Sequence, residues 1–174
     1  INVDGLGNLK LIEDLGKCFT IHPLIIEDIF NTGQRPKMED LDQYIYLNLK
    51  MLSYLDATKD IKIEHISMVF GHNFLISFQE DIGDIFDPVR ERIRKDGRIR
   101  KLGPDYLAYA LIDSIVDNYF TVMEKLEEQV EGLEEELVLN PTPDSLHRIN
   151  RLKKDMIFIR KSVWPLREMI NTLE

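Results

Sequence analysis

The sequence predicts an α+β fold: a mixed α/β part over residues 1–103, followed by a long antiparallel helical hairpin over residues 104–174. Three β-rich runs lie close together between residues 44 and 78. From Pro104 to Leu139 there is no further proline, and apolar residues recur there at helical spacing. The 174 residues are 44% hydrophobic, so the chain can bury a sizeable core and is not predicted to be disordered.

The first part is expected to begin with two short helices, over residues 8–18 and 23–31. Pro23 suits the first position of the second helix, where its missing N–H costs nothing. Strands are predicted from Tyr44 to about Leu55, over residues 61–70 and over residues 74–78. The last two strands are separated by Gly71-His72-Asn73, a plausible hairpin turn.

A third helix is predicted to start with Asp87 as its N-cap and Pro88 as its first residue, and to run toward Asp96-Gly97. The segment of Arg and Lys between Arg90 and Lys101 is interleaved with acids and contains no aromatic residue. It is interpreted as a solvated helix face or as a docking surface for an acidic helix.

The second part contains two apolar stripes at helical spacing. The first stripe consists of Tyr119, Val122, Leu126, Val130, Leu133 and Leu137. The segment 140–143 (Asn-Pro-Thr-Pro) breaks the helix, and Thr142 with Pro143 caps the next one. The second stripe consists of Leu146, Ile149, Leu152, Met156, Ile159, Val163, Leu166 and Ile170. Two helices joined by so short a break are expected to pack antiparallel, with a kink at Pro165.

The formal charge of −9 is unevenly distributed. Residues 104–139 carry ten acidic residues and one base, Lys125, whereas residues 140–174 carry a net positive charge. The two helices are therefore expected to bring an acidic face near a basic one. An acidic protein favours cations as partners, and nucleic acid is not expected.

Enzyme motifs are absent from the sequence: there is no Walker-type phosphate loop, no G-x-S-x-G and no H-E-x-x-H. The four histidines lack metal-ligand spacing, and the single cysteine, Cys18, is interpreted as a small buried residue. Apolar runs reach seven residues, so no membrane span is predicted within the chain. The start at Ile1, without a signal peptide, suggests a fragment.

Two carboxylate pairs are candidates for metal binding. Glu27 and Asp28 are adjacent among apolar residues, and Asp113 and Asp117 lie one helical turn apart in an otherwise apolar stretch. Paired carboxylates suit hard cations such as Mg²⁺, because they repel each other unless a cation compensates. The alternative is a solvated edge with internal salt bridges. The glutamates between positions 124 and 136 are interpreted as a solvated helix face.

Several strings resemble the CorA-type magnesium/cobalt transporter family, in its cytoplasmic domain. They are His22-Pro-Leu-Ile-Ile-Glu-Asp-Ile-Phe-Asn, Gln34-Arg-Pro-Lys, residues 78–94, residues 105–120 and residues 159–168. The resemblance implies an α/β/α sandwich with a mixed sheet, truncated at its first strands, and a helical hairpin. It also implies a homopentamer in the cell (inner) membrane. The stalk and transmembrane helices would lie outside this chain, and this portion would lie on the cytoplasmic side.

By the same resemblance, this is a divalent-cation-sensing regulatory domain and not an enzyme. Mg²⁺, with Co²⁺ possible, would be both transported and bound between protomers to hold the channel closed. The implied metal ligands are Asp28 at the principal site and Glu27 with Asp113 at a second site, with Asp117 beside them. The neighbour's stalk would supply the partner carboxylate. Two alternatives remain open: a related Zn²⁺ or Ni²⁺ transporter, and a soluble scaffold whose acidic hairpin binds a basic protein.

Overall fold

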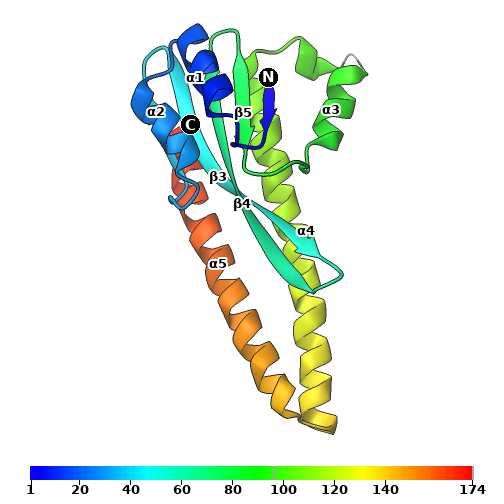
Figure 1. The fold of residues 1–174 in the computed structure, drawn as a ribbon. Coiled ribbons are helices and arrows are strands. Elements are labelled where there is room, and N and C mark those ends of the chain that lie inside the picture. The colour runs from blue at the N-terminus through cyan, green and yellow to red at the C-terminus, as the bar shows by residue number, and fades with distance from the viewer. Residues whose placement is uncertain (96, 174) are drawn as a thin grey trace.

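The structure is a computed structural model that describes residues 1–95 and 97–173. A five-stranded sheet lies between two layers of helices, and a long helical hairpin extends away from it (Figure 1). The predicted α+β fold, with a mixed sheet covered by helices and an antiparallel hairpin, is confirmed.

The sheet has the strand order β1-β5-β4-β3-β2. β1 pairs parallel with β5, whereas the other neighbours are antiparallel, so the sheet is mixed. The three predicted strands are present as β3, β4 and β5. β1 and β2 were not predicted, because three or four residues are too few to show alternation. The bounds are β1 Asn2–Asp4, β2 Lys37–Asp40, β3 Tyr44–Leu55, β4 Asp60–Gly71 and β5 Leu75–Gln79.

Both faces of the sheet are covered by helices, and β3 contributes side chains to the core on each face. Tyr44 and Tyr46 belong to a core with the first two helices, whereas Leu47, Leu49 and Met51 belong to a second core on the other face. Side chains alternate between faces along a strand, so one strand feeds both cores. This explains why most of β3 is buried and why its hydrophobic pattern is nearly continuous.

The first layer consists of α1 (Leu9–Cys18) and α2 (Pro23–Phe30), close to their predicted bounds. At Gly16 the helices approach so closely that a Cβ atom would lie 2.8 Å from Ile26 Cδ1. Cys18 is exposed at the end of α1, so the prediction that it is buried was wrong. Ile12 and Gly16 are the positions of α1 that face the core.

The helix α3 spans Asp87–Arg94, and its predicted cap was wrong by one residue. Phe86 is the N-cap and Asp87 is already helical, without a side-chain cap. Asp87 instead contacts Arg90, and Asp84 accepts the Phe86 N–H at 2.9 Å. The predicted end at Asp96 lies outside the described residues. A short 3₁₀ helix follows at Arg98–Arg100.

The hairpin consists of α4 (Pro104–Leu139) and α5 (Pro143–Leu173), which run antiparallel (Figure 1). Thr142 and Ser145 cap α5 reciprocally: the Ser145 N–H donates to Thr142 Oγ1 at 3.3 Å, and the Thr142 N–H donates to Ser145 Oγ at 3.0 Å. Glu136 of α4 accepts from Ser145 Oγ and pairs with Arg148. The predicted meeting of acidic and basic helices therefore occurs at the turn. Pro165 lies inside α5, which continues beyond it.

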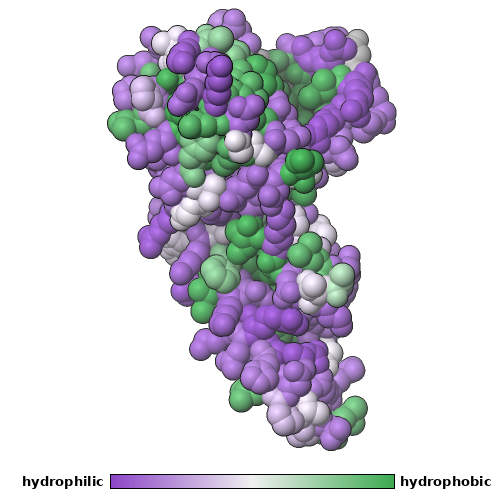
Figure 2. Space-filling view, in the orientation of Figure 1, coloured by the Kyte–Doolittle hydropathy of each residue, from purple (hydrophilic) through white to green (hydrophobic). Residues whose placement is uncertain are grey.

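The two predicted stripes differ in burial. On α4, Tyr119, Val122, Leu126 and Leu133 are buried and Leu137 is partly exposed. On α5, Leu152, Ile159 and Leu166 are buried, but the other five members of the stripe are exposed. The reason is that α4 and α5 diverge from the turn, where they meet, so α5 lacks a close partner along much of its length (Figure 1). Figure 2 shows hydrophobic residues scattered among hydrophilic ones over the hairpin.

The other glutamates assigned to the solvated face of α4 are exposed, as predicted. None of the helices among the described residues combines the length and apolar character needed to cross a membrane.

Candidate metal-binding sites

The helix α2 presents its two acids away from the core. His22 caps its start: the Leu24 N–H donates to His22 Nδ1 at 3.2 Å, and the His22 N–H donates to the Tyr44 hydroxyl at 2.8 Å. Ile25 and Ile29 are buried one turn apart. With that face toward the sheet and Ile26 packed against α1, the two acids lie on the outer side of the helix. Glu27 is exposed and Asp28 is half-buried.

Asp28 already has a cationic partner within the chain. Lys37 Nζ lies 2.7 Å from Asp28 Oδ2 and 2.6 Å from Glu39 Oε1, and it sits over the ring of Tyr46. Burial opposes the charged form of Lys37, but its hydrogen bonds to Asp28 and Glu39 prevail and raise the pKa of Lys37. The ammonium is therefore charged at physiological pH and neutralises Asp28. The internal salt bridge, which the sequence left open as an alternative, forms here.

Asp113 and Asp117 lie one turn apart on α4, where Asp113 is half-buried and Asp117 is exposed. They line a shallow cavity of about 250 Å³ between α3 and α4, together with Arg92. Two neighbours fix α4 in position: Ser114 Oγ donates to the Ile85 carbonyl at 3.2 Å, and Asn118 donates to the Leu52 carbonyl. Within the described part of the chain, neither Asp carboxylate has a hydrogen bond or ion pair. Like charges one turn apart, without a contacting cation, are what a hard metal ion would stabilise.

The sheet separates the two pairs. α2 packs on the face that carries Tyr46, whereas α4 packs on the face that carries Leu47 and Leu49. Among residues 1–95 and 97–173, no three His, Cys, Asp or Glu residues are arranged to hold a metal. If either pair bound a cation, it would supply only part of the coordination, and further oxygen ligands would have to come from water or another chain.

Lys37 and Glu39 are the residues that sequence reasoning missed at the α2 pair. They lie on β2, whose antiparallel pairing with β3 places Lys37 opposite Asn48 and Glu39 opposite Tyr46. A signal was present, since Lys37 follows the Gln-Arg-Pro string that was singled out. Without β2, however, nothing in the sequence placed Lys37 beside a carboxylate nine positions earlier.

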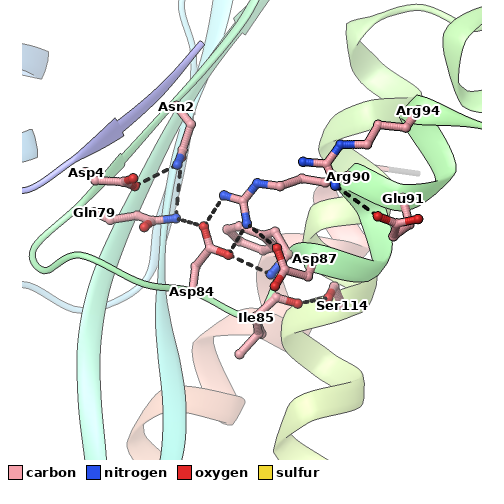
Figure 3. Close-up of polar contacts among 11 residues, drawn as sticks. Asn2, Asp4, Gln79, Asp84, Ile85, Asp87, Arg90, Glu91, Arg94 and Ser114 are labelled. Atoms are coloured by element: carbon pink, nitrogen blue, oxygen red, sulfur yellow. Dashed lines mark hydrogen bonds and ion pairs between the residues drawn. The ribbon is translucent and has the colours of Figure 1, made fainter.

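A second acidic residue missed by sequence is Asp84, whose side chain is 2% exposed. Figure 3 shows the Arg90 guanidinium facing both Asp84 oxygens, with Gln79 Nε2 donating to Asp84 at 3.0 Å. Burial alone would raise the pKa of Asp84, but the hydrogen bonds from Arg90, Gln79 and the Phe86 N–H outweigh it and lower that pKa. Through Asp84, this contact connects Arg90 of α3 with Gln79 of β5 and so holds α3 against the sheet. Asp84 and Arg90 therefore form a structural ion pair.

The fold is similar to that of two solved protein domains. It matches the soluble domain of CorA from Methanocaldococcus jannaschii with a TM-score of 0.77 and 18% identity, over 92% of this chain and 64% of that one. It also matches the cytoplasmic domain of ZntB from Vibrio parahaemolyticus, with a TM-score of 0.73 and 15% identity, over 93% of this chain and 64% of that one. At these identities the matches show the fold alone.

The sequence match is more specific. Residues 8–174 match the family described as CorA-like Mg²⁺ transporter protein. The chain is 42% identical over 174 residues to the cobalt/magnesium transport protein CorA of Thermotoga maritima, covering 99% of this chain and 50% of that protein. The chain belongs to the CorA-like Mg²⁺ transporter family, a family of transporters rather than enzymes. It spans about half the length of that relative.

Proposed function

We propose that residues 1–174 are the cytoplasmic, divalent-cation-sensing part of a homopentameric Mg²⁺ (and Co²⁺) transporter of the inner membrane. Mg²⁺ bound between neighbouring protomers would favour the closed state. The observation that carries this proposal is the arrangement of the carboxylates. A family member presents two pairs on opposite faces of its sheet, Glu27 with Asp28 and Asp113 with Asp117, and each is incomplete within one chain.

The donor chemistry of both pairs fits a hydrated hard cation. Carboxylate oxygens with water are the ligands that Mg²⁺ prefers, and few protein ligands give the weak binding that suits a sensor of an abundant ion. Bound Mg²⁺ would supply positive charge that offsets the repulsion between acidic groups of adjacent protomers.

At the α2 pair, Lys37 is the partner of Asp28 when no metal ion is bound. Asp28 is neutralised by Lys37 inside each protomer, so a cation shared with a neighbour has to compete with the ammonium for the same carboxylate. As the Mg²⁺ concentration falls, Asp28 pairs again with Lys37 of its own protomer, and the link between protomers is lost. This is a population shift, because the ion binds the linked assembly better than the separated one.

The test is a Mg²⁺ titration of the full-length transporter in lipid, with resistance to limited proteolysis as the readout. Wild type is expected to become more resistant as Mg²⁺ rises. Replacing Asp28 and Asp113 together by Ala should abolish that response, because one carboxylate is removed from each pair. The matched control is Asp14→Ala with Asp144→Ala, which removes two exposed carboxylates elsewhere.

An unchanged Mg²⁺ response in the Asp28→Ala/Asp113→Ala variant would contradict the site assignment. For residues 1–174 alone, weak or undetectable Mg²⁺ binding is expected, since a neighbour's ligands are missing. A tight site on the isolated domain would equally contradict sites shared between protomers. Repeating the protease-resistance titration with Zn²⁺ and Ni²⁺ distinguishes the related transporters, which the fold does not separate.

A further inference from the structure

A second concave site lies where the upper part of α5 passes the edge of the sheet near β2 and β3 (Figure 1). Its volume is about 770 Å³, within the roughly 300–1,000 Å³ usual for small-molecule sites. Its wall comes from three segments: the loop Gly33–Pro36, the strands at Lys50 and Ile63, and the stretch of α5 from Phe158 to Pro165. The carboxylates assigned to metal binding do not line it.

The lining is strongly basic. Arg35, Lys50, Arg160 and Lys161 all line the cavity, and no Asp or Glu does so. In a protein of net charge −9, this is a local concentration of positive charge. Within the described residues, none of the four cations forms an ion pair with a carboxylate. Like charges gathered without counterions attract a multiply charged anion.

Lys50 is the most constrained of the four cations. It is half-buried, and Lys50 Nζ donates to the neutral carbonyl of Thr32 at 2.5 Å. Burial lowers the pKa of Lys50, against a weaker opposing effect from Glu80. An ammonium that is partly removed from water without a bound carboxylate gains most from an anionic ligand.

The loop wall is held in place before any ligand binds. Gln34 Nε2 donates to the Asp28 carbonyl at 2.6 Å and to the Tyr46 hydroxyl at 3.2 Å. Together with the Lys50 contact to Thr32, these bonds fix the loop against the sheet. A preformed wall lowers the ordering cost of binding.

The cavity also exposes two aromatic side chains, Trp164 (63% exposed) and Phe158 (48% exposed). Large rings left in water beside guanidinium and ammonium groups form a stacking surface. A planar base gains affinity by stacking on such a ring, as bases do in proteins that bind single-stranded nucleic acid. Inorganic phosphate would use the cations and leave both rings unused.

We propose that this cavity binds a nucleoside di- or triphosphate, with its phosphates on Arg35, Lys50, Arg160 and Lys161 and its base on Trp164 or Phe158. The site is independent of the metal sites in its ligands, but its loop contacts the backbone of Asp28 through Gln34. A bound nucleotide would therefore rest against the segment that holds one of the carboxylate pairs.

Trp164 can serve as an intrinsic fluorescence probe of binding, because it is the single tryptophan in the sequence. Residues 1–174 are titrated with ATP, ADP, adenosine and inorganic tripolyphosphate in EDTA, with fluorescence excited at a wavelength that the base does not absorb. ATP and ADP are expected to quench Trp164 in a saturable way, and adenosine to bind much more weakly. The absence of free Mg²⁺ makes the result independent of the proposed metal sites.

The variant Arg160→Gln/Lys161→Gln should weaken ATP binding by about tenfold or more, since each lost charge-assisted contact matters. Lys154→Gln is the matched control: it is an exposed cation of α5 outside the cavity, and binding should be unchanged. Trp164→Leu, measured by calorimetry, should weaken ATP but leave tripolyphosphate unaffected.

Three results would overturn the proposal. The first is no saturable quenching by millimolar ATP. The second is equal binding of ATP and tripolyphosphate, which would mean that the rings contribute nothing. The third is a response to a poly-glutamate peptide without one to ATP, which would make the cavity a docking site for acidic protein.

Discussion

The two carboxylate pairs consist of similar residues but differ in whether a basic side chain within the same chain neutralises them. Asp28 of α2 holds Lys37 at 2.7 Å, whereas Asp113 and Asp117 of α4 have no ion pair within the described residues and share their cavity with Arg92. At the proposed sites, a cation would have to displace a bound ammonium at the first pair, whereas at the second pair no hydrogen bond or ion pair from the described residues would compete with it. We therefore expect the two pairs to differ in affinity for Mg²⁺, although both consist of carboxylates. The pair at α2 should bind more weakly, because Lys37 competes there.

The sheet between the two pairs contains a buried histidine, His65. His65 of β4 is 1% exposed, with Nε2 2.9 Å from Ser67 Oγ and Nδ1 without a hydrogen-bond partner among the described residues. Burial, assisted by Lys50, lowers the pKa of His65 to about 4 from 6.5. The folded state therefore keeps His65 neutral over a pH range in which the unfolded chain protonates it.

The largest expected effect in this comparison is loss of stability in acid. The unfolded state binds more protons between about pH 6.5 and pH 4, so stability is full above this window and falls as pH decreases through it. A depression of this size corresponds to about 3 kcal/mol. Urea unfolding of residues 1–174 at pH 7 and pH 4.5 measures it, and His65→Gln should flatten the difference. An equal loss in His65→Gln would assign the effect to other groups.

A smaller effect separates the pairs. Lys37→Gln removes the ammonium that competes for Asp28, so Mg²⁺ should act at lower concentration in the full-length transporter, by about fivefold. The midpoint of protease protection measures this shift. Lys17→Gln is the control, because Lys17 pairs with Asp14 on the exposed side of α1 and should change nothing. If Lys37→Gln left the midpoint unchanged, Lys37 would not be the competitor at Asp28.

The smallest effect is expected at the α4 pair. Arg92 lines the same cavity as Asp113 and Asp117 without forming an ion pair with them, so Arg92→Gln should lower the Mg²⁺ midpoint by only about twofold. The same protease assay serves, with Arg98→Gln as an exposed control. A shift larger than that of Lys37→Gln would reverse the proposed order of the two pairs.

Much of the fold could be predicted because long elements carry their own pattern. The stripe around Val122 and Leu126, the caps at Pro23 and Thr142, and the β-rich runs predicted the helices α2, α4 and α5 and the strands β3, β4 and β5 close to their observed bounds. The short strands β1 and β2 could not be found, since three or four residues are too few to show alternation, and β1 in addition pairs with β5, more than 70 positions later. The exposure of Met156 and Leu146 was also beyond the sequence, because spacing shows a face but not whether another helix covers it.

The sequence by itself determined the family, the α+β fold and the presence of two carboxylate pairs. These follow from local hydrophobic patterns and from short sequence segments that are characteristic of the family. The tertiary structure decided that Lys37 neutralises Asp28, that the sheet separates Asp28 from Asp113, and that Arg35, Lys50 and Arg160 share one cavity. The reason is physical: electrostatic interactions depend on distance in space, and residues far apart in sequence become neighbours only when the strands pair and α5 returns along the sheet.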